Sequence, residues 1–168
     1  LLGQNLLANY FNKLGLEDIT VVSPDLGSVT RSRKFANQLD GDVPLAIIDK
    51  RRPKASVSEV MNLIGDVEGR NIIMLDDMID TAGTITNAAN ALKKFGAKDI
   101  YACCTHAVLS GPAIERIKES SITKLIVLDT IKLPEEKKLD NIEVLTVADL
   151  FADAIKKIFN NESVSVLF

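Results

Sequence analysis

Several features that would point to particular protein classes are missing from this 168-residue sequence. No apolar run approaches the roughly 20 residues that a membrane-spanning helix needs. The first residues also lack the basic segment and cleavage site of a secretion signal. The net charge is -3 and no extended block of Lys or Arg is present, which argues against binding to nucleic acid or acidic membranes. We therefore expect a cytoplasmic protein that binds neither nucleic acid nor a membrane.

Cysteine and histidine are scarce as well. The only two cysteines, Cys103 and Cys104, are adjacent in an apolar run. Neighbouring side chains on a strand point to opposite faces, so an ordinary intrachain disulfide or a metal clamp is not expected. The only histidine, His106, ends the same run without a nearby ligand pattern. We interpret it as a hydrogen-bonded structural residue in preference to a base or a metal ligand.

The residues that are present predict one α/β domain over residues 1–168. The sequence is 46% hydrophobic and 26% charged and contains no repeat or linker, as in a single globular domain. Short runs rich in Ile and Val alternate with helical patterns, which predicts a mainly parallel, twisted sheet flanked by helices on both faces. The predicted strands are residues 19–23, 44–49, 71–77, 99–106, 124–128 and 142–147, and the predicted helices are 2–14, 84–96, 111–120 and 147–159.

Two segments do not follow this alternation. Residues 50–59, KRRPKASVSE, match neither helical nor strand periodicity and predict a mobile basic loop. Residues 163–168, SVSVLF, alternate small polar and apolar residues, which predicts a final strand or an interface tail.

The polar residues that follow the strands are candidates for ligand binding, because ligands of open parallel sheets collect at the carboxyl ends of the strands. Residues 23–28, 49–52 and 76–84 occupy such positions. We expect the three segments to meet at one edge of the sheet.

The strongest motif is IIMLDDMIDTAGT at residues 72–84, which joins a buried strand to a helix. Its last four residues can turn tightly enough for amides, hydroxyls and the helix N-terminus to surround a phosphate; they are Thr81, Ala82, Gly83 and Thr84. Asp76 and Asp77 would repel a phosphate and instead suit sugar hydroxyls or a metal ion. The motif therefore predicts a phosphorylated sugar as ligand, whereas an acidic pair without the turn would be an ordinary helix cap.

The string DDMIDTAGT at residues 76–84 resembles the phosphoribosyl diphosphate loop shared by type I phosphoribosyltransferases and ribose-phosphate diphosphokinases. Further segments, spread over nearly the whole chain, resemble the diphosphokinases in particular; they are residues 21–36, 46–54, 103–117, 131–138 and 160–168. The resemblance implies a type I phosphoribosyltransferase-like fold. It also implies that residues 1–168 are the carboxyl-terminal domain of a two-domain protein whose amino-terminal domain is absent here.

The resemblance also implies roles for particular residues. Asp25 of the string SPD would bind Mg²⁺, Lys50 of IDKRRP would be catalytic, and Arg52 would contact the sugar phosphate. Taken alone, Asp25 fits a plain turn and the cationic run fits a solvated surface. Where the family has a second glycine after the aspartate, this chain has Ser28, which would weaken binding if the backbone there needs a positive φ or a close approach to a ligand.

The remaining implied roles concern the substrate and regulation. Asp80 and the four residues after it would hold the 5-phosphate of ribose 5-phosphate, while Asp76 and Asp77 would bind the ribose hydroxyls. Ser163 and Ser165 would belong to an allosteric nucleotide or phosphate site between subunits, although an edge strand explains the same pattern. The turn Ser110-Gly111-Pro112 precedes a predicted helix, and any functional reading of it comes only from the resemblance.

The activity implied is transfer of the diphosphoryl group of Mg-ATP to ribose 5-phosphate, giving phosphoribosyl diphosphate and AMP for nucleotide biosynthesis. The resemblance further implies a homohexamer for the full-length protein. Because much of the adenine site would lie in the missing half, we expect this chain alone to be inactive. Two alternatives stay open: a phosphoribosyltransferase, and a non-catalytic regulatory module that binds phosphoribosyl compounds.

Overall fold

The computed structural model describes residues 1–51 and 60–168, without the side chains of residues 50, 51, 60 and 61. The strands are β1 (Ile19–Ser23), β2 (Leu45–Arg51), β3 (Val60–Ile64), β4 (Asn71–Ile79), β5 (Ile100–Ala107), β6 (Lys124–Leu128) and β7 (Ile142–Leu145). The helices are α1 (Gln4–Leu14), α2 (Val29–Ala36), α3 (Gly83–Lys94), α4 (Ala113–Glu119) and α5 (Ala148–Phe159), with short 3₁₀ turns η1 (Glu135–Lys137) and η2 (Ser165–Leu167).

The strands form one sheet in the order β3-β2-β1-β4-β5-β6-β7. Every neighbouring pair is parallel except β2 and β3, which are antiparallel. The prediction of a mainly parallel sheet is therefore confirmed. Two elements were not predicted, the edge strand β3 and the helix α2.

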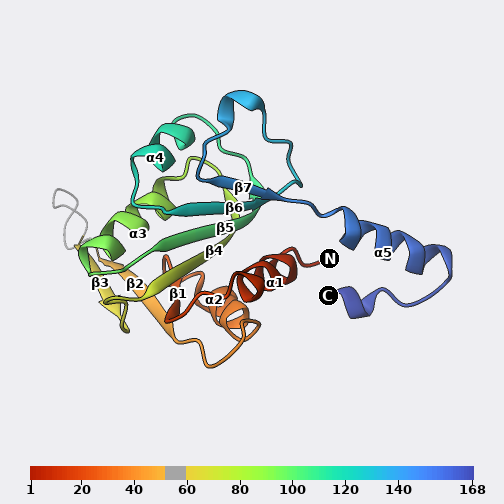
Figure 1. The fold of residues 1–168 in the computed structure, drawn as a ribbon, viewed down its shortest axis with the longest axis horizontal. Helices are drawn as coiled ribbons and strands as arrows, with labels where there is room; N and C mark the ends of the chain where they lie inside the picture. Colours follow the sequence, from red (N-terminus) through yellow and green to blue (C-terminus); the bar gives the residue numbers. More distant parts are fainter. Residues whose placement is uncertain (52–59) are drawn as a thin grey trace.

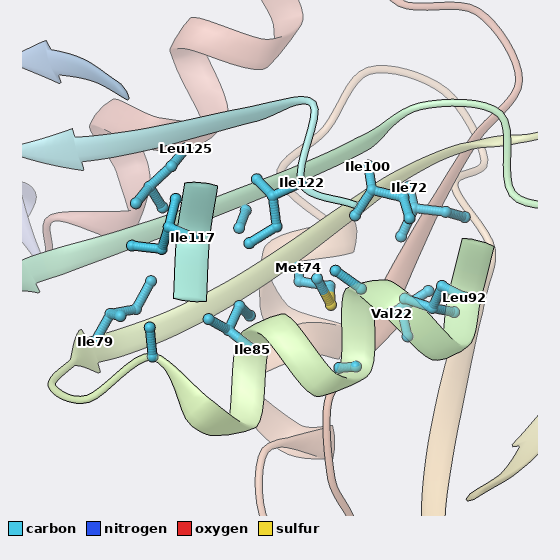
Figure 2. Close-up of a cluster of buried hydrophobic side chains, with 14 of the residues drawn as sticks. Val22, Ile72, Met74, Ile79, Ile85, Leu92, Ile100, Ile117, Ile122 and Leu125 are labelled. Carbon is cyan, nitrogen blue, oxygen red and sulfur yellow. The ribbon is translucent and has the colours of Figure 1, made fainter. Parts of the chain in front are cut away.

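Helices cover both faces of the sheet (Figure 1). One face packs against α1 and α2, whose Leu7, Phe11 and Phe35 are buried together with Val21 of β1. The other face packs against α3 and α4, and Figure 2 shows the side chains of this cluster between those helices and the strands. Adjacent strand residues serve opposite faces, as Cys103 belongs to the first cluster and Cys104 to the second. Both cysteines are buried and free, in agreement with the sequence.

The order of the strands reverses between β1 and β4. From β1 the chain passes to β2 on one side, and β4 then pairs with β1 on the other side. The carboxyl ends of β2, β1 and β4 consequently lie at the same edge of the sheet, with β1 in the middle. A crevice outside such a reversal is where open α/β sheets bind ligands.

The carboxyl-terminal part of the chain leaves this layered body. Helix α5 extends away from the sheet, and the chain then turns back so that its two ends lie near each other (Figure 1). Of the two interpretations of residues 163–168, the final strand is wrong, because residues 165–167 form the 3₁₀ turn η2; the interface tail stays a prediction. Its small residues find no neighbouring strand among the described residues. No helix in the described part of the chain is long and apolar enough to span a bilayer.

Candidate functional site

The three predicted ligand segments lie at the carboxyl ends of neighbouring strands, but not all of their residues follow the strands. Residues 24–28 follow β1 and the loop that begins at Asp80 follows β4, whereas residues 49–51 and the acidic pair belong to β2 and β4 themselves. Lys50 is near the carboxyl end of β2, where its backbone pairs with Met61 of β3. The side chain of Lys50 and the whole of Arg52 lie outside the described residues, as does most of the predicted basic loop.

A tight turn connects β4 to α3 and forms the candidate phosphate loop, defined here as residues 80–84. Ala82 has a positive φ of 60° and lies directly before the first residue of α3. Thr86 secures this turn, since its amide and its hydroxyl donate to the Ala82 carbonyl at 3.1 and 2.8 Å. A pocket of about 180 Å³ opens beside the loop, lined by residues 76 and 78–85. The first amides of a helix have no partner within it, so the amino end of α3 offers donors to an anion here.

The acidic pair of β4 is held by an arginine that the sequence analysis did not identify. Arg31 of α2 donates from Nη1 to Asp76 Oδ1 at 2.7 Å and from Nη2 to Asp77 Oδ2 at 2.9 Å. The Asp77 amide also donates to Asp76 Oδ1 at 2.9 Å. Helix α2 follows β1, so Arg31 reaches across the reversal of strand order to β4. A guanidinium fork on two carboxylates fixes the direction in which both can accept hydrogen bonds.

The two carboxylates differ in their environments. The side chain of Asp76 is 22% exposed, whereas that of Asp77 is 63% exposed. Burial, followed by the interaction with Asp77, raises the pKa of Asp76 to about 6. Burial also opposes ionisation of Asp77, but its interactions with Asp76 and Arg31 outweigh that effect and lower the pKa of Asp77. At neutral pH the pair is therefore a strong acceptor of hydrogen bonds from hydroxyl groups.

Asp25 lies in the loop between β1 and α2 and binds Ser28, the residue directly before α2. Its Oδ1 accepts from the amide and from the hydroxyl of Ser28, both at 2.9 Å. Ser28 has a φ of -90°, so the backbone at this position, where the family has a second glycine, does not need a positive φ. The condition under which Ser28 would strain the backbone is thus not met, and its hydroxyl instead helps to orient Asp25.

Asp25 was predicted to bind Mg²⁺. Within the described residues, no group of three or more His, Cys, Asp or Glu is arranged to hold a metal ion. In a phosphate-transfer site Mg²⁺ takes one or two protein carboxylates and completes its shell with substrate oxygens and water, so a single carboxylate can serve it. Asp25 can supply one such carboxylate, since Ser28 engages only Oδ1.

The hydrogen bonds of His106, Ser163 and Ser165 involve no residue of the phosphate loop. His106 Nδ1 is 3.0 Å from Thr130 Oγ1, which in turn donates to the Thr105 carbonyl at 2.6 Å. The hydrogen bond expected of His106 is thus present, whereas its side chain is exposed and its structural role stays a prediction. The hydroxyls of Ser163 and Ser165 are 2.8 Å apart and exposed. They follow α5 away from the sheet, so the structure does not bring them to the phosphate loop (Figure 1).

Two further residues that contact the phosphate loop were not identified as site residues from the sequence. Ser110 donates its hydroxyl hydrogen bond to Asp80 Oδ1, and Arg116 Nη1 donates to the Thr81 carbonyl at 2.9 Å. A signal for Ser110 was present in the turn before α4. Arg31 and Arg116 lie on helices among other charged residues, and nothing local distinguishes them from solvated surface cations.

Curated relatives match this chain over its whole length. The ribose-phosphate pyrophosphokinase of Clostridium perfringens is 61% identical over 171 residues, covering 100% of this chain and 53% of the relative. That of Bacillus cereus is 59% identical over 168 residues, covering 100% of this chain and 52% of the relative. The chain thus spans about half the length of the curated relatives it matches.

Solved structures show the same relationship. The phosphoribosylpyrophosphate synthetase of Mycobacterium smegmatis matches with a TM-score of 0.86 and 42% identity, over 94% of this chain and 51% of that one. A purine phosphoribosyltransferase of Pyrococcus horikoshii, at 18% identity, shares the fold with a TM-score of 0.51, over 85% of this chain and 83% of that one. Residues 29–168 match the family described as phosphoribosyl synthetase-associated domain. The chain belongs to this phosphoribosyl synthetase family.

Proposed function

We propose that this chain provides the sugar-phosphate site of a ribose-phosphate diphosphokinase, which transfers the diphosphoryl group of Mg-ATP to ribose 5-phosphate and releases AMP. The observation that carries the proposal is one pocket lined both by Asp76, which Arg31 holds together with Asp77, and by the residues of the loop and of the amino end of α3. An acceptor pair for a polyol and a donor cluster for an anion are the two halves of a sugar phosphate site. The identity to curated ribose-phosphate pyrophosphokinases supports the same reaction.

Each part of the site has a role in this reaction. The amides and hydroxyls of residues 80–84 bind the 5-phosphate, and Asp76 with Asp77 accepts hydrogen bonds from the ribose hydroxyls. The C1 hydroxyl is thereby oriented toward the β-phosphorus of ATP, so that positioning supplies much of the catalysis. Arg31 contributes by holding the two carboxylates in place while it neutralises part of their mutual repulsion.

The diphosphoryl group carries negative charge that cations must neutralise during its transfer. Mg²⁺, when bound, neutralises oxygens of the triphosphate, and Asp25 is the residue that would hold it from this chain. Lys50 stabilises the charge that develops during transfer, and Arg52 contacts the sugar phosphate. Lys50 is on the strand next to Asp25, at the same edge of the sheet, as this role requires.

The remaining features of the proposal concern the whole protein. The adenine site and a further Mg²⁺ ligand come from a second domain, so the isolated chain binds ribose 5-phosphate without turning over ATP. The complete protein is a homohexamer of the cytoplasm, and Ser163 and Ser165 contribute to an allosteric anion site between its subunits. Their paired hydroxyls and exposure are compatible with that role.

The test is AMP formation from Mg-ATP in the presence and absence of ribose 5-phosphate. It compares this chain with a version extended to the length of its relatives. We expect AMP formation only in the extended protein and only with ribose 5-phosphate present. Transfer to a nucleobase from phosphoribosyl diphosphate would instead establish the phosphoribosyltransferase alternative, and the absence of either reaction in a folded extended protein would favour the regulatory module.

Binding to this chain provides a second test. Titration calorimetry should detect ribose 5-phosphate, and Asp80→Ala should weaken that binding, because the Asp80 carboxylate ties the loop to Ser110. The matched control is Asp140→Asn, which changes a carboxylate distant from the loop in sequence and outside the pocket lining. Unchanged affinity in Asp80→Ala would contradict the assignment of residues 80–84 to the phosphate.

A further inference from the structure

The connection between β5 and α4 contacts the back of the phosphate loop. The Leu109 amide donates to the Ile79 carbonyl at 3.1 Å, and the Ser110 amide donates to the Asp80 carbonyl at 3.0 Å. Leu109 is fully buried and adopts a positive φ of 49°. A non-glycine residue in this conformation persists only where its surroundings hold it. The connection is therefore a fixed support for the loop.

Arg116 of α4 binds the next carbonyl of the loop after those of Ile79 and Asp80. Its Nη1 donates to the Thr81 carbonyl at 2.9 Å. A Cβ placed on Gly83 would be 3.2 Å from the same nitrogen, closer than ordinary van der Waals contact. The guanidinium thus lies over the amino end of α3, and glycine at position 83 leaves room for it.

The three supported carbonyls belong to consecutive residues, Ile79, Asp80 and Thr81. In a planar trans peptide the carbonyl and the following N–H point in opposite directions. When the carbonyls of residues 79–81 are bound to the segment from Leu109 to Arg116, the amides of residues 80–82 must face away from it. Fixed amides that face one way form the kind of concave donor site that binds anions.

The Asp80 carboxylate poses a separate problem, because a negative charge inside a phosphate loop repels the ligand. In the structure its Oδ1 accepts the hydroxyl hydrogen bond of Ser110. Ser110 lies in the connection between β5 and α4, so its hydroxyl binds the Asp80 carboxylate from the side of the loop that this connection supports. Ser110 therefore holds the Asp80 residue at both its backbone carbonyl and its side chain.

We propose that Ser110 and Arg116 are positioning residues that preorganise the loop of residues 80–84 for the phosphate group of a sugar phosphate. Neither residue needs to contact the ligand. Their effect is to hold three consecutive carbonyls and one carboxylate on the far side of the loop, so that binding does not have to order the amides. The ligand class rests on the proposed function, whereas the ordering of the loop does not.

The experiment uses this chain with Ser110→Ala and Arg116→Ala as separate variants. We expect each to weaken binding of ribose 5-phosphate roughly tenfold, as the loss of a charge-assisted hydrogen bond predicts. Because Arg116 is exposed, its truncation should leave the fold intact. Ser110→Thr keeps the hydroxyl and should restore most of the affinity. Affinity for ribose without phosphate should not change in any variant.

Two controls match these changes. Ser120→Ala removes a serine at the other end of α4 whose hydroxyl donates to the Ile117 carbonyl at 2.8 Å. Lys118→Ala removes an exposed cation from the same helix as Arg116. Both controls should leave affinity for ribose 5-phosphate unchanged.

A readout without ligand separates this proposal from the proposed function. Amide order parameters of residues 80–84, measured by NMR relaxation, should be near those of rigid backbone, about 0.85, and should fall toward roughly 0.6 in Ser110→Ala and Arg116→Ala. If the order parameters and the affinity stay unchanged in both variants, the proposal is overturned. If the parent chain does not bind ribose 5-phosphate, the proposed function fails, and the order parameters alone then support or overturn the role of Ser110 and Arg116.

Discussion

Helices α3 and α5 have the same length and very different surroundings. Each contains 12 residues and is amphipathic. Helix α3 buries five side chains, whereas α5 buries only Ala154. The apolar residues of α5 are instead exposed, at 65% for Ile155, 66% for Ile158 and 85% for Phe159. An amphipathic pattern therefore predicts a helix reliably, but it does not say whether the rest of the same chain covers the apolar face.

The two helices are buried to different extents because they follow different strands of the sheet. Helix α3 connects β4 to its parallel neighbour β5, and such a crossover packs back onto the sheet. Its packing also fixes the amino end that carries the phosphate loop. Helix α5 follows β7 at the edge of the sheet, so no further strand draws it back (Figure 1). It leaves an apolar hollow of about 270 Å³, lined by residues of α5 and by both ends of the chain.

The largest expected effect comes from emptying the packed side of α3. Leu92 is fully buried in the cluster between α3 and the sheet (Figure 2). Leu92→Ala should lower the free energy of unfolding by about 3 kcal/mol, because truncation of a buried leucine loses transfer free energy and leaves a cavity. Urea unfolding followed by circular dichroism measures this change. A loss below about 1 kcal/mol would mean that α3 packs much less tightly than the structure indicates.

A smaller effect is expected from the acidic pair next to α3, and it depends on pH. The pKa of Asp76 is raised to about 6, mainly by burial, from about 3.9 in an unfolded chain. The protonated form is thus favoured in the folded state. Its stabilising contribution is fully present below about pH 4 and is lost as the pH rises through about 6. The lowered pKa of Asp77 acts in the opposite sense, since its contribution is lost as the pH falls.

Asp76→Asn removes the titration and should flatten this part of the profile. Between pH 4 and pH 7 the parent chain should lose roughly 2 kcal/mol of stability relative to the variant, from a shift of about two pKa units. Unfolding free energies measured at half-unit intervals of pH would reveal the difference. Parallel profiles for the two proteins would show that Asp76 titrates as in the unfolded chain. A constant offset from the lost contact with Arg31 would not affect the comparison.

The sequence was sufficient to predict the sheet but not its edge. The runs that became β1 and β4 are rich in Ile or Val, the run that became β5 is apolar over most of its length, and all three bury both faces, so their pattern is strong. The strand β3 was missed because it is an antiparallel edge strand next to a polar segment. Helix α2 was missed because its apolar face consists of little more than Phe35 and Ala36.

The candidate site was also predicted only in part. The string of residues 72–84 carries the acidic pair and the turn within one local segment, so it could be identified without a structure. The contacts that orient it come from distant segments: Arg31 is 45 residues from Asp76, and Ser110 is 30 residues from Asp80. Pairings of this kind depend on the order of the strands, and a single sequence contains no direct signal for them. Local chemistry was thus predictable, whereas the residues that hold it in position were not.

The smallest effect is expected on α5, and it is the sharpest test of the comparison. Ile158→Gln replaces a side chain that is 66% exposed, so the free energy of unfolding should change by less than about 0.5 kcal/mol. Far smaller than the loss in Leu92→Ala, this change should also be independent of protein concentration. If the loss instead approaches that of Leu92→Ala and the urea midpoint of the parent chain rises with concentration, α5 is covered by another molecule in solution. In that case both helices would bury their apolar faces, α3 against the sheet of its own chain and α5 against another molecule.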